Sequence, residues 1–480
     1  MVASRKSYIA NPEELNSNTH TGLYRVMRRL IGLALGFYFR RIERFHVERV
    51  PANGPVLFVS NHPNSLTDSF VIGASVPRKV NFIGTVQLFQ FAPVKWLLTR
   101  CGVIPINRVK DNPKAMRSVA DTFEAVYQVL ERGEAVGIFP EGVTYDDSAL
   151  KEVKSGAARM ALELEHRHGG KIGLRVVPVG LTYSAKEIYR SDALVNFGEP
   201  IAAADYIEGY TERRKECIVR LTEEIERRIQ SLIVHIPKLE QTRVVEGVKR
   251  LYFDRLLLGN RVASEPAAGQ AKELWLSQQI AEAVDGVYRT QPERAAAFAA
   301  KLDFYERWLA RLKISNEALE LFPQRTALAA QTSEWAFIAI VGAPIAIYGW
   351  LHRLIPYALI KWAERKFTMP GRRKAQASTT AIAAGVVGFG VCYAVYIALF
   401  QWVFGWPASL WYTLSLPVTG LLAHYYLREI RRHWASVHTA IVLLRAPFAA
   451  RRLLAMRSGL IAEIEAVRSE RVGEIQISKS

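Results

Sequence analysis

A histidine followed at short range by an aspartate is the first feature of the sequence that could do chemistry. The apolar run Val56–Ser60 leads into Asn61-His62-Pro63-Asn64-Ser65-Leu66-Thr67-Asp68. A carboxylate that holds one ring nitrogen of His62 protonated would leave the other nitrogen free to take a proton from a substrate. Taken alone, such a pair is more often structural, for instance as part of a helix N-cap. The interpretation therefore depends on what accompanies it.

A second segment, Gly102-Val103-Ile104-Pro105-Ile106-Asn107-Arg108, could bind an anion. Gly102 and Pro105 would shape a tight strand end, and Arg108 offers a planar guanidinium group that suits phosphate. When this segment is considered alone, a surface arginine after a turn is the better explanation.

The third and fourth segments also come from strand-like runs. In Phe139-Pro140-Glu141-Gly142, Glu141 could accept hydrogen bonds from substrate hydroxyls, and Gly142 would allow a close approach to the backbone. A plain strand-ending turn is the simpler reading of this segment by itself. Val176-Val177-Pro178-Val179-Gly180 is apolar and cannot be told from a core strand.

The elements that must position these residues alternate between β-rich and helical patterns. Strand-like runs are Val56–Ser60, Val80–Gly84, Gly102–Pro105, Ala135–Phe139, Arg175–Tyr183 and Leu194–Phe197, with helical candidates at Pro113–Arg132 and Ser155–Glu165. This alternation predicts an α/β fold, a mixed and largely buried sheet with flanking helices. Sites of such sheets usually lie where strands end and lead into helices.

In this order and at these spacings, the four segments resemble the glycerophospholipid acyltransferase superfamily, which includes lysophosphatidic acid and glycerol-3-phosphate acyltransferases. The resemblance covers about Pro51–Pro200 and reaches Lys154-Ser155-Gly156-Ala157. It implies that His62 is a general base and that Asp68 orients it. It also implies an acceptor site in the second and third segments and an acyl donor near the fourth. The implied acceptor-binding residues are Gly102, Pro105, Arg108, Phe139, Pro140, Glu141, Gly142 and Lys154.

One departure from the family pattern concerns the spacing of the histidine and the aspartate. The common pattern has four residues between them, whereas this chain has five, with Thr67 in the usual place of the carboxylate. One extra residue rotates a helical side chain by about 100°, so Pro63-Asn64-Ser65 must form a turn that brings Asp68 back. This variant resembles the branch typified by fungal glycerol-3-phosphate/dihydroxyacetone-phosphate acyltransferases, which favours glycerol-3-phosphate as acceptor.

The resemblance implies transfer of a fatty acyl group from an acyl thioester, either acyl-CoA or acyl-ACP, to glycerol-3-phosphate or lysophosphatidate. Such a reaction needs neither a metal nor another cofactor. A covalent acyl-enzyme is disfavoured because Ser60, Ser65 and Ser155 lie in no Gly-x-Ser-x-Gly elbow. Two alternatives stay open: strict 1-acylglycerol-3-phosphate acyltransferase activity, and a non-catalytic lipid-binding member of the fold.

Composition and charge limit the class of protein. The chain has 480 residues, 50% of them hydrophobic, with 63 Lys+Arg against 45 Asp+Glu, which gives a formal charge of +18. This composition excludes a disordered chain. Three widely spaced cysteines match no metal or redox motif, as expected in a reducing compartment. Beside membrane segments, the positive charge predicts anionic membrane lipids rather than nucleic acid as partners.

The C-terminal part carries the membrane signal. The 53 residues from Ala375 to Leu427 contain no Asp, Glu, Lys or Arg, and two spans are expected at about 379–404 and 408–427. Basic flanks predict that both ends of this hairpin are cytoplasmic. The apolar segment 335–360 contains Pro344 and Pro356 and is expected to be re-entrant or interfacial. A multi-pass protein of the bacterial inner membrane follows, or of the endoplasmic reticulum in a eukaryote.

The expected layout has five parts. They are an N-terminal segment (1–50) with an amphipathic, interfacial helix in 23–47, the α/β acyltransferase domain (51–210), a helical region (211–330), the membrane region (331–430) and a basic amphipathic tail (431–480). The first 22 residues lack an apolar core, so no cleavable signal peptide is expected.

Overall fold

The chain is described by a computed structural model that divides into two compact units. The structure describes residues 21–106, 116–142, 150–186, 188–236, 239–258, 270–314, 316, 319, 325–367 and 373–477. The first unit comprises residues 1–235 together with 366–382, and the second comprises residues 236–365 together with 383–480.

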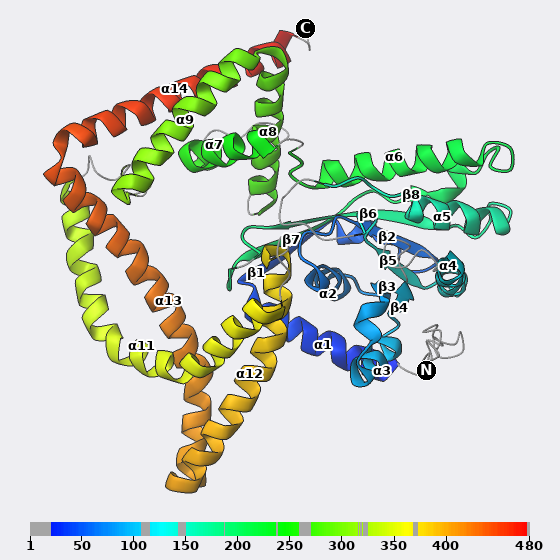
Figure 1. The fold of residues 1–480 in the computed structure, drawn as a ribbon, viewed down its shortest axis with the longest axis horizontal. Coiled ribbons are helices and arrows are strands. Elements are labelled where there is room, and N and C mark those ends of the chain that lie inside the picture. The colour runs from blue at the N-terminus through cyan, green and yellow to red at the C-terminus, as the bar shows by residue number, and fades with distance from the viewer. Residues whose placement is uncertain are drawn as a thin grey trace, which may run out of the picture. The chain divides into compact units, whose positions relative to one another are not determined.

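A mixed eight-stranded sheet forms the centre of the first unit, as the sequence pattern predicts (Figure 1). The strands are β1 (Arg41–Phe45), β2 (Val56–Ser60), β3 (Val80–Thr85), β4 (Ile104–Ile106), β5 (Ala135–Ile138), β6 (Arg175–Tyr183), β7 (Asp192–Phe197) and β8 (Ile201–Ala202). Their order is β1-β7-β6-β2-β5-β3-β4, with β8 beside β6. Neighbouring strands run parallel except for β6 with β7 and β6 with β8. The ends of β2, β5 and β6 therefore meet at one edge.

Helices cover both faces of this sheet because alternate strand side chains point to opposite sides. Leu57 and Val59 of β2 join a core with α4 (Met116–Glu131), α5 (Gly156–Arg167) and α6 (Arg214–Leu232). Val56 and Phe58 join the opposite core, with α1 (Thr21–Tyr38) and α2 (Leu66–Ser75). Figure 1 shows α5 and α6 on one side of the sheet and α1 and α2 on the other. The fully buried β2 thus carries an apolar residue at each of its first four positions.

The sheet begins at Arg41, ten residues before the domain boundary expected at residue 51. The segment 23–47, expected to be one helix, ends as α1 at Tyr38 and continues as the edge strand β1. β1 pairs in parallel with β7, and Arg40 beside it donates from Nε to Asp192 Oδ1 over 2.9 Å. Charged residues suit an edge strand because they discourage pairing with other chains. They also make the strand hard to recognise in sequence.

The first unit also contains a short segment from far along the chain, residues 366–382. Within it begins α12 (Arg373–Phe404), whose residues Ala381 and Ile382 pack against the core beneath α1 and α2. The long C-terminal part is therefore tied to the sheet domain through the first turns of one helix.

Every regular element that the structure describes in the second unit is a helix. It holds α7 (Leu239–Leu258), α8 (Gln270–Thr290), α9 (Pro292–Leu312), most of α11 (Arg325–Phe367), the rest of α12, α13 (Trp406–Arg445) and α14 (Pro447–Ile477). Its core joins α7, α9 and α14 through Tyr252, Leu302, Tyr305 and Leu453. α11 runs as a helix through Pro344 and Pro356, where the sequence suggested an interrupted element.

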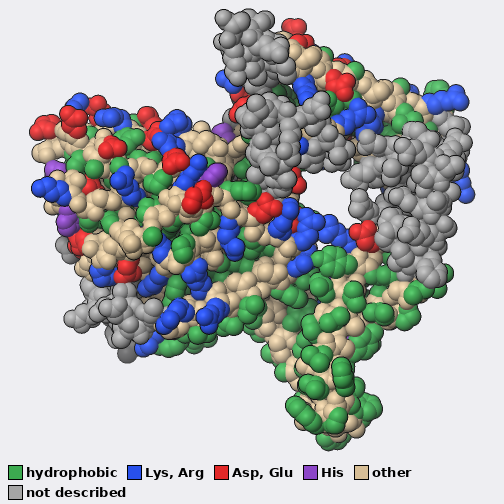
Figure 2. Space-filling view, turned by 180° about the vertical axis from the view of Figure 1, so that it is seen from behind, with side chains coloured by type: hydrophobic (Ala, Val, Ile, Leu, Met, Phe, Trp, Pro, Cys, Tyr) green, Lys and Arg blue, Asp and Glu red, His purple; other side chains and the backbone are tan. Residues whose placement is uncertain are grey.

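One helix is long and apolar enough to cross a membrane among the residues that the structure describes, namely residues Gln376–Phe404 of α12. Its most apolar window has a mean hydropathy of 2.1, and only 11% of that window is buried. Figure 2 shows hydrophobic side chains crowded over the projecting end of the second unit. The second expected span, 408–427, lies in α13 and does not meet the same criterion, so a multi-pass topology stays a prediction.

Candidate active site

The two residues singled out first, His62 and Asp68, are hydrogen-bonded to each other just beyond β2. His62 Nδ1 lies 2.9 Å from Asp68 Oδ2. Asp68 is fully buried, whereas the side chain of His62 is 16% exposed. The hydroxyl of Tyr183, at the end of β6, donates to Asp68 Oδ1 over 2.7 Å, and the backbone N–H of Asn64 donates to Oδ2 over 2.7 Å. The carboxylate is thus fixed by three donors.

A turn absorbs the extra residue between the histidine and the aspartate. Ser65 has a φ of 53°, and the backbone N–H of Asp68 donates to the carbonyl oxygen of Ser65 over 3.1 Å. α2 begins only at Leu66, so the chain turns before it becomes helical. This is the turn that the five-residue spacing requires, and it returns Asp68 to the imidazole.

The imidazole ring of His62 packs on the aromatic ring of Phe139 and is partly exposed to solvent. It stacks on Phe139 with ring centroids 4.1 Å apart and an angle of 15° between the planes. Among the residues that the structure describes, none makes a hydrogen bond to Nε2, the nitrogen opposite Asp68. If Asp68 holds Nδ1 protonated, Nε2 carries the lone pair. The ring is therefore arranged to accept a proton at Nε2.

Glu141 is placed next to His62, but its oxygens face the backbone. Oε1 accepts from the backbone N–H of His62 over 2.8 Å, and Oε2 accepts from that of Lys151 over 3.2 Å. The residue is 6% exposed. Burial raises the pKa of the Glu141 carboxyl above its ordinary value, and the two amides oppose part of that rise. The expected contact of Glu141 with an acceptor hydroxyl stays a prediction.

Gly142 and Lys154 lie together beside Glu141. Gly142 has a φ of 71°, and a Cβ atom at that position would lie 2.7 Å from Lys154 Nζ. The backbone N–H of Lys154 donates to the carbonyl oxygen of Pro140 over 3.2 Å, which ties the start of α5 to the end of β5. The exposed ammonium group of Lys154 thus lies in the space that a side chain at position 142 would need, and it could attract a phosphate there.

The second predicted segment is described only in part. Gly102 has a φ of 83° and is buried, and Pro105 lies in β4, where its carbonyl oxygen accepts from Thr122 Oγ1 over 3.0 Å. Both belong to the strand region at the β3–β4 side of the sheet. Arg108, the expected phosphate ligand, lies outside the described residues.

Four residues of the site were not anticipated from the sequence: Asn64, Tyr183, Ser378 and Thr379. Tyr183 ends the predicted strand Arg175–Tyr183, but only the parallel pairing of this strand with β2 brings its hydroxyl to Asp68. Ser378 and Thr379 carried no such signal, since they lie in the uncharged apolar stretch more than 300 residues away.

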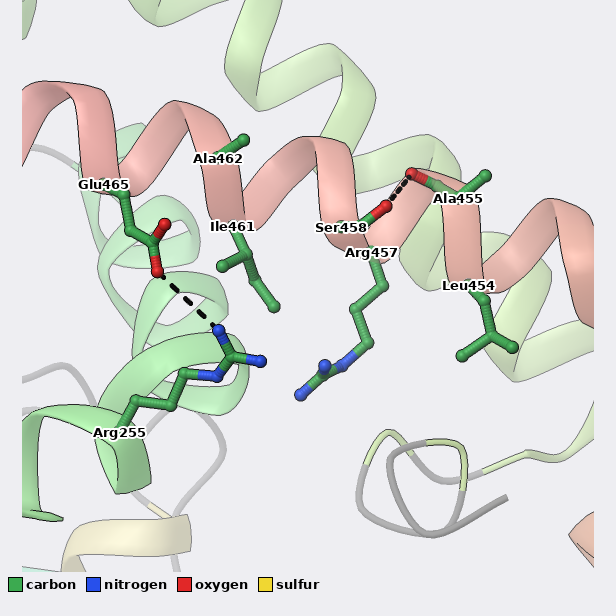
Figure 3. Close-up of a pocket in the computed structure, with 8 residues that line it drawn as sticks. All are labelled: Arg255, Leu454, Ala455, Arg457, Ser458, Ile461, Ala462 and Glu465. Atoms are coloured by element: carbon green, nitrogen blue, oxygen red, sulfur yellow. Dashed lines mark hydrogen bonds and ion pairs between the residues drawn. The ribbon is translucent and has the colours of Figure 1, made fainter. Parts of the chain in front are cut away.

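A separate hollow of about 540 Å³ lies in the second unit, between α7 and α14 (Figure 3). Arg255 and Arg457 point into it, and Arg255 Nη1 lies 3.7 Å from Glu465 Oε1. It contains none of the residues that the sequence motifs single out.

Comparison with known proteins identifies the sheet region. Residues 41–182 match the family model described as "Acyltransferase". "Glycerol-3-phosphate O-acyltransferase 2" of Saccharomyces cerevisiae is 33% identical over 133 residues, which cover 28% of this chain and 18% of that protein. The "1-acyl-sn-glycerol-3-phosphate acyltransferase" of Bacillus subtilis is 24% identical over 194 residues, 40% of this chain and 87% of that protein.

Longer but weaker matches extend the comparison. An uncharacterized acyltransferase of Schizosaccharomyces pombe is 22% identical over 319 residues, 48% of this chain and 47% of that protein. The chain thus spans less than half the length of this relative and of the yeast enzyme. The crystal structure of the 1-acyl-sn-glycerophosphate acyltransferase of Thermotoga maritima matches with a TM-score of 0.31 and 19% identity, over 42% of this chain and 80% of that one.

Proposed function

Because residues 41–182 are an acyltransferase domain of the glycerophospholipid acyltransferase superfamily, we propose that the chain transfers a fatty acyl group from an acyl thioester to a hydroxyl of a glycerophosphate acceptor. The observation that carries this proposal is the hydrogen bond between His62 Nδ1 and the buried Asp68 carboxylate. It leaves Nε2 as the one ring nitrogen able to act as a base.

That geometry supports the following reaction. Nε2 of His62 removes the proton of the acceptor hydroxyl as its oxygen attacks the thioester carbonyl, and Asp68 stabilises the imidazolium that forms. The tetrahedral intermediate collapses, the C–S bond breaks, and His62 returns its proton to the leaving thiolate. An ester and a free thiol result. General-base help of this kind contributes about 10²–10⁴-fold.

The remaining residues of the site are assigned to binding. Lys154, which lies over Gly142, offers a cation for the acceptor phosphate, and Arg108 is a further phosphate ligand by family resemblance. Gly102, Pro105 and Pro140 shape the strand ends. Phe139 forms an apolar wall beside His62. The segment of β6 around Gly180 lies towards the acyl donor, which carries either coenzyme A or acyl carrier protein.

Glycerol-3-phosphate is the acceptor we favour. The five-residue spacing of His62 and Asp68 resembles the fungal glycerol-3-phosphate branch, and the yeast enzyme of that name is 33% identical over the matched residues. Lysophosphatidate is the second candidate, because several relatives named 1-acyl-sn-glycerol-3-phosphate acyltransferase match the chain at 24–28% identity. The apolar helix of α12 would hold the enzyme in the membrane, with the sheet domain on the cytoplasmic side and basic residues facing anionic lipid.

A competition assay tests this proposal. Membranes containing the full chain are incubated with labelled acyl-CoA or acyl-ACP and with glycerol-3-phosphate, dihydroxyacetone phosphate and lysophosphatidate together. We expect label mainly in lysophosphatidate from glycerol-3-phosphate. His62→Ala should abolish transfer, and Asp68→Asn should reduce it at least about tenfold, because a wrong tautomer disables the base.

The matched control is His168→Ala, because His168 also pairs with a carboxylate. Its Nε2 lies 3.0 Å from Glu131 Oε1, but this pair is exposed and remote from β2. This variant should keep full activity. Failure of the wild-type chain to label any acceptor would instead support the non-catalytic, lipid-binding alternative.

A further inference from the structure

Two hydroxyl residues at the start of α12 contact the loop between His62 and Asp68. Ser378 Oγ lies 3.0 Å from Thr67 Oγ1, and Thr379 Oγ1 lies 2.8 Å from the same atom. All of these residues belong to the first unit, although 311 or 312 positions separate the partners. Thr67 and Ser378 are fully buried. These contacts are therefore shielded from water, where hydrogen bonds of this kind count most.

Thr379 supplies a helix cap that α2 lacks. The first N–H groups of a helix have no partner within the helix, and a side chain at the N-cap usually accepts one of them. Ser65, at the N-cap of α2, makes no such bond. The backbone N–H of Thr67 instead donates to Thr379 Oγ1 over 3.2 Å. The first turn of α2, which carries Asp68, is thus capped by a residue from another part of the chain.

Ser378 acts on the loop through Asn64. Its hydroxyl donates to Asn64 Oδ1 over 2.6 Å, and the backbone N–H of Asn64 donates in turn to Asp68 Oδ2 over 2.7 Å. Asp68 Oδ2 is the atom that accepts from His62 Nδ1. Hydrogen bonds through the side chain and the backbone N–H of Asn64 therefore connect the start of α12 to the carboxylate that orients the imidazole ring.

The same helix is the one suited to cross a membrane. The apolar segment begins at Gln376, so Ser378 and Thr379 lie in its first turn, and Ala381 and Ile382 in the next turn pack against the core of the first unit. When this helix docks on the sheet domain, the same contacts complete the hydrogen bonds of the loop between His62 and Asp68.

We propose that Ser378 and Thr379 are positioning residues for the acyl transfer: the start of the candidate membrane helix holds the extended His–Asp loop in its productive shape. The inference rests on the proposed function. It also explains how a loop one residue longer than the common pattern keeps its shape. Thr67 occupies the usual place of the carboxylate, and its hydroxyl bonds to Ser378 and Thr379 of α12.

A double-mutant cycle in the full-length, membrane-embedded chain tests this inference. Thr379→Val and Thr67→Val each remove one side of the contact with little change in volume. We expect each to lower kcat about tenfold and to leave the KM for the acceptor within about twofold, because the loop and not the acceptor site is disturbed. The double variant should be no worse than the poorer single variant.

Two further variants separate the hydroxyl from the fold. Thr379→Ser keeps the hydroxyl and should restore kcat to within about twofold of wild type. Thr380→Val is the matched control, because Thr380 is the next residue of the same helix and makes no hydrogen bond to residues 62–68, all of which the structure describes. This variant should behave as wild type. Hydrogen exchange of the Thr67 amide is a readout that does not depend on activity. It should be faster in Thr379→Val than in the wild type, and unchanged in Thr379→Ser and Thr380→Val.

The outcomes divide cleanly. Wild-type kcat together with unchanged exchange of the Thr67 amide in Thr379→Val would overturn the inference and leave acyl transfer standing. Additive losses in the cycle would also overturn it, since they would mean that the two residues act separately. A wild-type chain inactive on every acceptor would overturn the proposed function, and faster amide exchange in Thr379→Val would then still support the structural contact.

Discussion

Two buried carboxylates hold His62 from different sides. Asp68 accepts from the ring, and Glu141 accepts from the backbone N–H of the same residue, so ring and main chain are fixed independently. Tyr183 completes the arrangement. Burial, and next the charge of Asp68, hold the pKa of the Tyr183 phenol well above its ordinary value. Its proton therefore stays in place to donate to Asp68 throughout the pH range in which an imidazole titrates.

Glu141→Gln should lower kcat and leave the KM for the phosphorylated acceptor nearly unchanged. The amide NH₂ group of glutamine would face a backbone N–H where the carboxylate accepts, so one of two bonds is lost. We expect a loss of about tenfold in kcat. In the wild type, burial raises the pKa of Glu141. The ionised form accepts both amides, so kcat should fall as pH falls through that raised pKa, and the variant should lack this step.

Glu165→Gln is the matched control for that measurement. Glu165 is fully buried, and its oxygens accept from the backbone N–H groups of Gly173 and Leu174 over 3.2 and 3.0 Å. Its replacement should lower the melting temperature without changing the pH dependence of kcat. A rise in the KM for the acceptor at constant kcat in Glu141→Gln would assign Glu141 to acceptor binding instead.

At the residue scale, sequence reasoning found the His–Asp pair but not all of its supports. The order and spacing of motifs pointed to His62, Asp68 and Glu141. The hydrogen-bond donors to Glu141 could not be predicted from the sequence, because a carboxylate that follows a strand can face either a substrate or a backbone amide. Tyr183 was taken as the end of an apolar strand, and its hydroxyl has no signature in a pattern of hydrophobicity.

Among the elements, the parallel pairing of β2 with β5 and β6 brings the chemistry together. Val59 pairs with Ile138 and with Pro178, so the residues that follow β2 and β5 emerge side by side. Each strand is short and apolar, and the polar residues come directly after it. These strands were predictable from composition alone. Strand order was not, because pairing partners depend on contacts between distant segments that one sequence does not display.

Gly102 lies in the turn between α3 (Ala92–Arg100) and β4. Gly102→Ala should destabilise the first unit by about 1–3 kcal/mol. Gly102 has a φ of 83°, and a Cβ atom there would lie 2.1 Å from Asn81 Oδ1. Asn81 Nδ2 donates to the carbonyl oxygen of Ala135 over 3.0 Å, so a displaced Asn81 would loosen β3 from β5.

The measurement is the thermal midpoint of the purified chain in detergent. Gly36→Ala is the control, because Gly36 lies in α1 with open space where its Cβ would be. That variant should be neutral or slightly stabilising, since alanine favours a helix over glycine by up to about 1 kcal/mol. An equal midpoint for Gly102→Ala and the wild type would contradict the steric argument.

For the molecule as a whole, the question is whether α12 enters a membrane. Val391 lies near the middle of the apolar segment and is 59% exposed. Val391→Lys should reduce the fraction of chain that resists extraction by alkaline carbonate, because a lysine at the centre of a span costs about 2.5–3.5 kcal/mol. Val219→Lys is the control, since Val219 is 51% exposed on α6 of the sheet domain. It should leave extraction unchanged.

The long-range link to residues 378 and 379 shows where sequence reasoning ends at this scale. A serine and a threonine in an uncharged helix resemble ordinary span residues, whose hydroxyls bond to their own helix. Only the folded chain shows that they face Asn64 and Thr67. The expected boundary between a sheet domain and a membrane part is thus crossed by the first turns of α12, up to Ile382.

This link also bears on the order in which the protein is made. A ribosome completes residue 67 long before residue 378, and at about 5–20 residues per second the 311 positions between them take roughly 15–60 seconds. During that interval the nascent sheet domain lacks the cap on α2. The hydrogen bonds that the start of α12 makes to the loop between His62 and Asp68 can therefore form only after the apolar segment of this helix has been synthesised.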